Sequence, residues 1–432
     1  MTEQRDLHIT VLALVRVEGE GGLDVVLRQG RVESLELRIF EPPRFFEKFL
    51  EGRAFHEIPD AVARICGICP VAYQMSAVQA VEAAFGVTVT EWIKNMRRAV
   101  YCGEWIESHA LHIHMLAAPD FFGCSSVVEL AKQRRVEVER GLRLQRLGND
   151  IITLFGGRSV HPVGVRVGGF AHAPRRADVA ALRERLCAAL PEAAELVQWT
   201  ASWPLPVREQ KFTQVALQHA QNYAIGDGVL ITSTGERIDA AQFARRFHEE
   251  HMPHSTALHC TLDGQSYLVG PLARVNFNYD RLPVPVRQAI AATSVAFPSA
   301  NMFHSVVARA VEIYFALWEA ARILDDYDEP EQIAVPVNPR AATGVGMTEA
   351  PRGVLWHEYA FNERGEVLRA RIVPPTSQNQ ARIEADLREN IEREGAQLND
   401  DELRQLCETV IRNYDPCISC ATHFLDLRVQ RG

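Results

Sequence analysis

The sequence predicts an α+β fold, mainly helical, that begins with a small antiparallel β-meander. Two patterns predict it: residues 8–40 read as strands, and apolar residues recur at helical spacing in most later segments. No internal repeat, low-complexity tract or long flexible linker divides the sequence. We therefore expect one domain over residues 1–432, with an N-terminal sheet at about 8–40 and a helical body at about 41–423.

The N-terminal strands are expected to be short and separated by turn residues. His8–Val15 is rich in apolar residues, Gly19–Gly22 supplies a turn, and Leu23–Arg28 follows. After a second turn at Gln29–Gly30, Val32–Ile39 alternates apolar and polar side chains, as a half-buried strand does. These segments predict the antiparallel meander.

The helical body is expected to start near Pro70. From there apolar residues recur at helical spacing as far as Phe85, and Gly86 provides a C-terminal stop. A long helix is predicted from Glu91 to about Leu116. Further helices are expected over 177–200, 284–325, 380–395 and Glu402–Tyr414, with Asn399 or Asp400 as the cap of the last. Loops rich in Gly and Pro are expected over 156–174, 261–271 and 334–353.

Composition and charge exclude some classes of function. Hydrophobic residues make up 47% of the 432 residues and charged residues 23%, which is ordinary for a soluble globular protein. The net charge of −9 argues against a general nucleic-acid binder, which would be basic. The N-terminus is charged, and no segment approaches the roughly 18–20 apolar residues of a membrane span. We expect a soluble, cytoplasmic chain with no membrane partner, although a subunit can be exported with a partner that carries the signal.

Nine cysteines are present, and four of them form two Cys-x-x-Cys pairs. Each pair places two sulfurs within reach of one metal, and four thiolates favour soft or borderline ions such as zinc, nickel or iron. One pair alone would also suit a redox dithiol, and two pairs a structural zinc ribbon. A zinc ribbon closes a loop of roughly 12–20 residues, whereas these pairs end at Cys69 and begin again at Cys417. The spacing therefore predicts a metal clamped between the two ends of the chain. The other cysteines are expected to be inert core thiols: Cys102, Cys124, Cys187, Cys260 and Cys407.

The residues around the two pairs resemble a known family. The pairs lie in Arg64-x-Cys66-Gly67-x-Cys69 and Asp415-Pro416-Cys417-x-x-Cys420-x-x-His423, similar to the two signatures of [NiFe] hydrogenase large subunits. The resemblance runs from about residue 8 to 423 and includes Arg16-Val17-Glu18-Gly19, Arg44-Phe45-Phe46-Glu47, Ser108-His109-x-x-His112, Gly168-Gly169-Phe170, Val269-Gly270-Pro271-Leu272-Ala273-Arg274, Glu349-Ala350-Pro351-Arg352-Gly353 and Pro374-Pro375-Thr376. The chain looks most like the cytoplasmic, NAD(P)-linked bidirectional or sulfhydrogenase-like group.

The resemblance implies a nickel–iron centre. Nickel would be held by all four thiolates, with Cys66 and Cys417 terminal and Cys69 and Cys420 bridging to an iron that carries CO and two cyanides. Heterolytic cleavage of H2 needs a Lewis-acidic metal and a nearby base, and the thiolate of Cys417 is the expected first proton acceptor. Glu18 matches the glutamate that relays protons from that cysteine. Without the motif, Glu18 would read as a solvated residue of a Gly-rich turn.

Other matched residues are expected to surround the centre. Arg352 matches an arginine that lies over the cyanides, where a fixed, charged guanidinium suits an anionic ligand; otherwise it would read as a surface ion-pair residue. Thr376 and the backbone at Pro375 are expected to bind the second cyanide. Glu47 and His423, with a backbone carbonyl near Ile372, match the ligands of a magnesium ion.

Three further residues are expected to support the site from outside the ligand set. His109 and His112 lie on one helix face and are expected to play a structural role beside the centre. Tyr73 stands where family members commonly have a histidine that hydrogen-bonds a bridging thiolate. A phenol can donate that bond but cannot readily carry a proton at neutral pH, so this is the main departure from the family pattern.

Partners are implied as well. The chain has no spare cysteine cluster, so iron–sulfur clusters would lie in a small subunit, and FAD and NAD(P) in diaphorase subunits, since no Gly-x-Gly-x-x-Gly follows a strand here. The tail 424–432 follows His423, after which a maturation endopeptidase cuts in the family. Three alternatives stay open at this stage: an F420-reducing hydrogenase, a hydrogen sensor, and a metal-free scaffold subunit like that of respiratory complex I, which the four intact cysteines disfavour.

Overall fold

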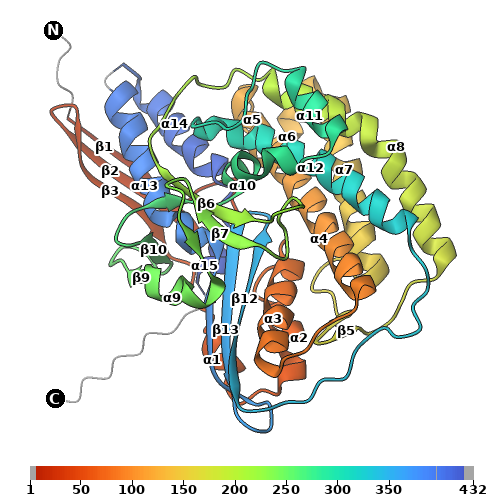
Figure 1. The fold of residues 1–432 in the computed structure, drawn as a ribbon. Helices are drawn as coiled ribbons and strands as arrows, with labels where there is room; N and C mark the ends of the chain where they lie inside the picture. The colour runs from red at the N-terminus through yellow and green to blue at the C-terminus, as the bar shows by residue number, and fades with distance from the viewer. Residues whose placement is uncertain (1–5, 396, 423–432) are drawn as a thin grey trace, which may run out of the picture.

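A computed structural model describes residues 6–395 and 397–422, so His423 and the tail 424–432 lie outside the described residues. The elements fall into a large group of helices, a central three-stranded sheet beside it, and the N-terminal sheet at the far side (Figure 1). This arrangement confirms the predicted α+β, mainly helical fold. Within the part of the chain that the structure describes, every helix is too short or too polar to span a lipid bilayer.

The helices of the described residues are α1 (Phe46–Leu50), α2 (Ile58–Val62), α3 (Pro70–Phe85), α4 (Glu91–Leu111), α5 (Ala118–Phe121), α6 (Val127–Gln133), α7 (Arg135–Gly156), α8 (Arg176–Ala201), α9 (Phe243–Arg246), α10 (Pro271–Asn278), α11 (Val284–Ala291), α12 (Ser305–Asp325), α13 (Pro375–Glu394), α14 (Asp400–Asn413) and α15 (Ile418–Ala421). The strands are β1 (Leu7–Val11), β2 (Gly21–Arg28), β3 (Arg31–Ile39), β4 (Val165–Arg166), β5 (Gly169–Phe170), β6 (Thr213–Gln218), β7 (Val229–Thr232), β8 (Arg237–Ile238), β9 (Phe247–His251), β10 (Leu258–Leu262), β11 (Tyr267–Leu268), β12 (Ala342–Ala350), β13 (Gly353–Phe361) and β14 (Val367–Val373).

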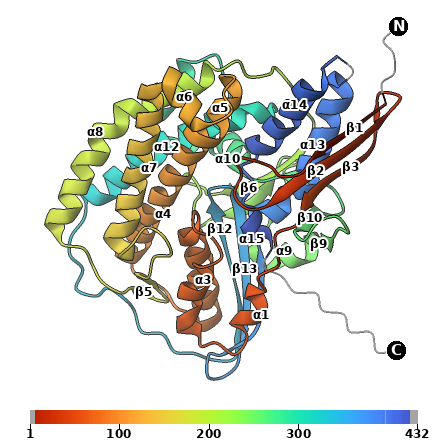
Figure 2. The same ribbon diagram turned by 180° about the vertical axis from the view of Figure 1, so that it is seen from behind.

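The N-terminal sheet is the predicted antiparallel meander, with strand order β1-β2-β3. It packs against α13, which lies beside it in Figure 2. The predicted turn at Gly19–Gly22 is wrong in its position, because Gly21 and Gly22 already pair with β3. The connection between β1 and β2 consists of residues 12–20. Contacts of this segment with distant residues, such as that of Glu18 with Cys417, keep it longer than a tight turn.

Most predicted helices are present, with changed ends. α3 ends at Gly86 with φ +68°, as predicted, and the long helix α4 continues through a π-helical turn at His112–Ala117. Asn399 caps α14 and pairs reciprocally with Glu402, which confirms the first of the two predicted caps. The segment 284–325 is two helices, α11 and α12, because residues 292–304 contain a proline and leave the helix. α13 begins at Pro375, five residues before the predicted start.

Several parts of the core were not predicted. α7 packs along α4, and β12 and β13 occupy residues that were expected to be loop or unassigned. Among the described residues, the body that follows the N-terminal sheet also contains four small sheets. Glycine explains the error in β12: a side chain at Gly344 or Gly346 would lie 2.1 Å from a backbone oxygen of α3, so these glycines allow the strand to approach the helix.

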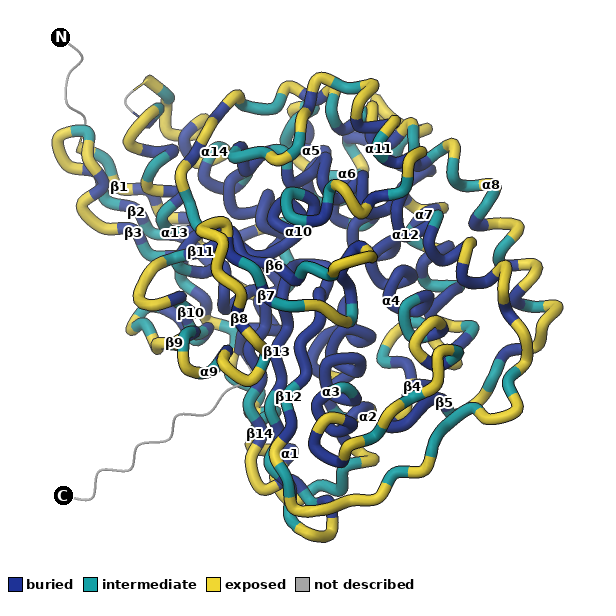
Figure 3. The backbone as a smooth tube through the Cα atoms, viewed as in Figure 1, coloured by how far each residue is buried: buried dark blue, intermediate teal, exposed yellow. Residues whose placement is uncertain are grey.

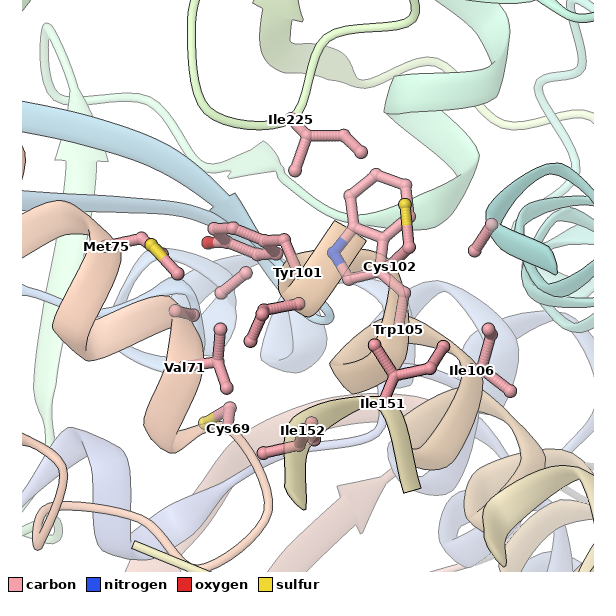
Figure 4. Packing of buried hydrophobic residues seen from close by; sticks show 14 of the residues in the cluster. Cys69, Val71, Met75, Tyr101, Cys102, Trp105, Ile106, Ile151, Ile152 and Ile225 are labelled. Atoms are coloured by element: carbon pink, nitrogen blue, oxygen red, sulfur yellow. The ribbon is translucent and has the colours of Figure 1, made fainter. Parts of the chain in front are cut away.

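The core runs from the helical group into the cysteine region. Buried residues dominate α3, α4 and the central sheet in Figure 3, whereas exposed residues lie on the outer loops. Figure 4 shows Cys69 at the start of α3 near Val71, with Trp105 of α4 and Ile151 of α7 further along the same packing. All four cysteines of the two pairs belong to this buried cluster. The predicted metal residues are therefore part of the folded core.

An ionic network lies fully buried between α4, α10 and α12. Arg274 donates to both carboxylate oxygens of Glu312 at 2.7 Å and to Glu349 at 3.1 Å. Glu312 also meets His109 at 2.9 Å and accepts from Tyr223 at 2.7 Å. The pKa of Glu312 falls to about 2 although burial alone would raise it, because Arg274 lies beside it; burial raises the pKa of Glu349 to about 7 against the same cation.

Replacing Arg274 by methionine is expected to lower the free energy of unfolding by about 3–5 kcal/mol, because two carboxylates would stay buried without their cation. Urea unfolding of the purified protein, followed by circular dichroism, measures the loss. Arg246→Met is the control, since Arg246 pairs with Asp263 and Glu236 at the surface and its loss should cost under about 1 kcal/mol. Equal losses in the two variants would contradict the role given to the buried network.

Candidate metal centre

The two cysteine pairs converge at one buried point. Cys66 Sγ lies 3.4 Å from Cys417 Sγ, and Cys69 Sγ lies 3.6 Å from Cys420 Sγ. All four sulfurs lie within 4.8 Å of one another and none is in a disulfide bond. Cys66 precedes α3 and Cys69 caps it, while Cys417 caps α15, so the two ends of the chain meet here as predicted.

Backbone contacts hold the two halves together. Ile418 N–H donates to the Glu18 carbonyl at 3.0 Å, and Cys417 N–H donates to Thr376 Oγ1 at 3.0 Å. Arg44 donates to the Ile65 carbonyl at 2.6 Å and also to the carbonyl of Ser419. One guanidinium thus joins the segment before Cys66 to the segment around Cys420.

The electrostatics of the cluster favour a thiolate. The other three thiols, Cys417 first, donate to Cys66 and bring its pKa well below the usual value. Burial raises the pKa of Cys417 well above its usual value. The cluster therefore holds negative charge and protons side by side in a dry environment, where a bound cation would displace the protons.

Glu18 lies directly beside this cluster, as predicted. Its Oε2 lies 3.1 Å from Cys417 Sγ and accepts from Ser419 N–H at 3.1 Å, while Ser419 Oγ donates to Oε1. Burial raises the pKa of Glu18, and the thiolate of Cys66 raises it further. The interpretation of Glu18 as a solvated turn residue is excluded.

Arg352 is buried at the same site rather than paired at the surface. Its Nε donates to the Asp415 carbonyl at 2.7 Å and its Nη2 to Asp415 Oδ1 at 3.1 Å. Its Nη1 is buried and has no hydrogen-bond partner among the described residues. A buried guanidinium with one unused donor nitrogen, next to four sulfurs, fits an anionic ligand that belongs to the metal centre.

The predicted magnesium residues are only partly placed by the structure. Ile372 N–H donates to Glu47 Oε1 at 2.7 Å, so these two residues do meet, while His423 lies outside the described residues. Glu249 on β9 was not predicted and also lies near Glu47; burial raises its pKa to about 8, and the charge of Glu47 contributes. The sequence around Glu249 does not indicate a metal-site role, because the residue stands in an ordinary charged stretch.

Tyr73 faces the cluster from α3. Burial, followed by the charge of Cys420 and Cys69, raises the pKa of Tyr73 well above its ordinary value, so the phenol stays protonated. A histidine does lie nearby, but it comes from β13: the rings of Tyr73 and His357 have centroids 5.7 Å apart. His357 Nδ1 lies 2.7 Å from the Tyr359 hydroxyl.

His109 and His112 form hydrogen bonds with residues outside the cysteine cluster. His109 meets Glu312, and His112 Nε2 lies 2.7 Å from the Arg412 carbonyl at the end of α14. Burial lowers the pKa of His109 to about 4 and that of His112 well below its usual value, so both are neutral. His112 therefore supports the helix that leads into Asp415 and Cys417.

Comparison with known proteins identifies the family of this site. The family model described as nickel-dependent hydrogenase matches residues 44–140 and 255–423, more than half of the chain and both cysteine pairs. The chain belongs to the nickel-dependent hydrogenase family. It is a [NiFe] hydrogenase large subunit, the catalytic chain of a hydrogen oxidoreductase, and the four-cysteine cluster is the candidate for its metal centre.

The relatives of this hydrogenase chain cover nearly its whole length. The sulfhydrogenase 1 subunit alpha of Pyrococcus furiosus is 32% identical over 98% of this chain and 99% of the relative. The sulfhydrogenase 2 subunit alpha of the same organism is 31% identical over 95% and 98%. Among solved structures, an NAD+-reducing [NiFe]-hydrogenase in the H2-reduced state has a TM-score of 0.87 and 26% identity, covering 96% of this chain and 99% of that one.

Two buried glutamates near the hydrogenase centre were not predicted. Glu104 accepts from Val71 N–H at 2.6 Å and Ala72 N–H at 2.9 Å, which fixes the first turn of α3 after Cys69. Burial raises the pKa of Glu107 well above its usual value, with Arg352 acting against it. Both stand in an otherwise apolar stretch of α4, and this pattern is the sequence feature that could have predicted that they are buried.

The five remaining cysteines fit the predicted inert role. Four are buried and Cys187 is half-buried. Burial raises the pKa of Cys102 and Cys407 to about 12, so both thiols stay protonated and unreactive. Among the described residues, no second group of cysteines lies close enough to hold a metal cluster.

Proposed function

We propose that this hydrogenase chain cleaves and forms H2 at a nickel–iron centre held by Cys66, Cys69, Cys417 and Cys420. The observation that carries the proposal is the 3.1 Å contact between Cys417 Sγ and Glu18 Oε2 inside a buried cluster of four sulfurs. When bound, such a centre supplies the Lewis acid that polarises H2. By resemblance, Cys66 and Cys417 would hold the nickel alone, whereas Cys69 and Cys420 would hold both nickel and iron.

The proton route follows from the contacts of Glu18. The sulfur of Cys417 takes the proton released from H2, and Glu18 Oε2 accepts it across the 3.1 Å contact. The raised pKa of Glu18 suits this exchange, because a carboxyl with an ordinary pKa would hold a proton poorly at neutral pH. Ser419 fixes the carboxylate through its N–H and hydroxyl, so the acceptor oxygen stays aimed at the sulfur.

Other side chains would hold the diatomic ligands and a magnesium ion. The free Nη1 of Arg352 would donate to one cyanide of the iron, and Thr376 with the backbone at Pro375 would bind the second, while CO needs no donor. Glu47 and His423, with Ile372, would bind magnesium. Tyr73 would donate to the bridging sulfur of Cys420, in the position where relatives commonly have histidine.

Electrons would leave through other polypeptides in the cytoplasm. The two Pyrococcus relatives are named as alpha subunits, which supports a complex with an iron–sulfur small subunit. The similar solved structure is named as NAD+-reducing, which supports diaphorase subunits carrying FAD and NAD(P) as the final acceptor site. A maturation endopeptidase would remove residues 424–432.

Metal analysis and infrared spectroscopy of the purified complex test the proposal together. We expect one nickel per chain, with iron, and stretching bands of CO and cyanide that change when H2 is added. H2-dependent reduction of NAD+, NADP+ or F420, assayed side by side, identifies the acceptor. Zinc without nickel, or the absence of CO and cyanide bands in complex that oxidises H2, would overturn it.

A further inference from the structure

A second group of metal-binding side chains lies outside the hydrogenase centre. It consists of His254 in the loop between β9 and β10, His259 on β10, and Glu384 on α13. The ligand atoms of these three residues all lie within 4.8 Å of one another. Glu384 follows Thr376, which contacts Cys417, by eight residues, so Glu384 lies roughly 12 Å further along α13 than Thr376.

The spacing of the three side chains already approaches that of a metal site. His254 Nε2 lies 2.9 Å from Glu384 Oε1, and His259 Nε2 lies 3.4 Å from Glu384 Oε2. Ligands about 2.0–2.1 Å from a tetrahedral ion are separated by about 3.3 Å. A small outward movement of His254 therefore makes room for an ion, and His259 needs almost none.

A purely hydrogen-bonded cluster explains His259 poorly. His259 is only 4% exposed, yet neither of its ring nitrogens has a hydrogen-bond partner among the described residues. Its Nε2 lies 3.4 Å from Glu384 Oε2, which is an ion-pair distance but long for a hydrogen bond. Leaving the polar nitrogens of a buried imidazole without hydrogen bonds is unfavourable for folding. A bound cation would satisfy the nitrogen that faces the carboxylate.

The surroundings fix the carboxylate and the loop. Glu384 Oε1 accepts from Leu37 N–H of β3 at 3.0 Å, a contact to a ligand carboxylate that orients it toward the two rings. Thr256, between the two histidines, donates from its N–H to the Ile39 carbonyl at 2.8 Å and from its hydroxyl to the Glu41 carbonyl at 2.8 Å. The strand β3, the β9–β10 loop and the helix α13, which are distant in sequence, thus meet at the Glu384 carboxylate.

We propose that His254, His259 and Glu384 bind one zinc-class divalent ion that is separate from the nickel–iron centre. Two imidazoles and one carboxylate are a donor set that zinc takes, with water in the fourth position. The ion cross-links the β9–β10 loop to α13 and, through Leu37, braces β3.

The test uses the intact complex, loaded with Zn²⁺ alone and passed through gel filtration before metal analysis. We expect about one zinc per chain to remain in the unaltered complex. His259→Gln and Glu384→Gln should lose that zinc and weaken Zn²⁺ binding at least about tenfold, with nickel content and H2 oxidation unchanged. Gln at 384 keeps the acceptor for Leu37 N–H, so a folding defect would not explain its effect. His248→Gln, on the exposed face of β9, is the matched control and should keep the zinc.

X-ray absorption at the zinc edge separates this site from zinc held at the cysteines. Nitrogen and oxygen neighbours at about 2.0–2.1 Å, with no sulfur, are expected, whereas zinc in the cysteine cluster would show sulfur at about 2.3 Å. Zinc retained equally by His259→Gln and Glu384→Gln would overturn the proposal, as would no retained zinc in the unaltered complex or sulfur neighbours alone. None of these outcomes depends on whether the hydrogenase proposal is right.

Discussion

Cys69→Ser is expected to abolish H2 oxidation and to lower nickel to background in the purified complex. Cys69 Sγ lies 3.6 Å from Cys420 Sγ, on the side of the cluster assigned to both metals. A serine hydroxyl is a hard ligand that stays protonated, so it replaces a thiolate poorly at a soft metal. The remaining three sulfurs would lack one of the two bridges that the proposed centre needs.

Nickel and iron are measured by inductively coupled plasma mass spectrometry, and activity by H2-dependent dye reduction. Cys187→Ser is the matched control, because Cys187 is half-buried and lies on α8, away from the cluster. The control should keep metal and activity close to the unaltered values. Full nickel content in Cys69→Ser would remove Cys69 from the ligand set and contradict the four-sulfur centre.

Glu18→Gln is expected to lower H2 oxidation by about 10²–10⁴-fold while nickel, iron and the infrared bands stay unchanged. Glutamine keeps the size of the side chain and an oxygen that accepts from Ser419 N–H. It cannot accept a proton from Cys417 at neutral pH. The expected loss is therefore in proton transfer, with the cluster intact.

The pH dependence gives a second readout for Glu18. Burial raises its pKa in the folded chain, and a carboxyl that is already protonated cannot accept a proton. H2 oxidation in the unaltered complex should therefore fall as the pH drops through this raised pKa, and Glu18→Gln should lack that step. Glu20→Gln, exposed in the same loop, is the control and should behave as the unaltered complex does. Normal activity in Glu18→Gln would assign the proton route to another residue.

Much of the candidate site could be predicted from the sequence because its chemistry is carried by residue types at conspicuous spacing. The two Cys-x-x-Cys pairs indicated a metal clamp, and the resemblance of the motifs around Glu18 and Arg352 to the hydrogenase family implied that both residues lie at the centre. Helices with clear apolar periodicity and a glycine stop, such as α3, were predicted for the same reason: local pattern reports local structure.

The tertiary structure alone decided features that depend on what a residue meets. β12 was missed because Gly344 and Gly346 resemble loop glycines until α3 is seen packed against them. Glu249 looks like an ordinary charged residue, and Glu104 is marked only by its apolar neighbours in the sequence; their positions beside Glu47 and at the start of α3 are visible only in the folded chain. His254, His259 and Glu384 are 5 and 125 residues apart along the chain, so no spacing rule links them. The sequence by itself therefore determined which atoms could bind the nickel–iron centre, because ligand chemistry resides in side chains. The structure decided which other groups reach each other, because burial and distance arise only when the chain folds.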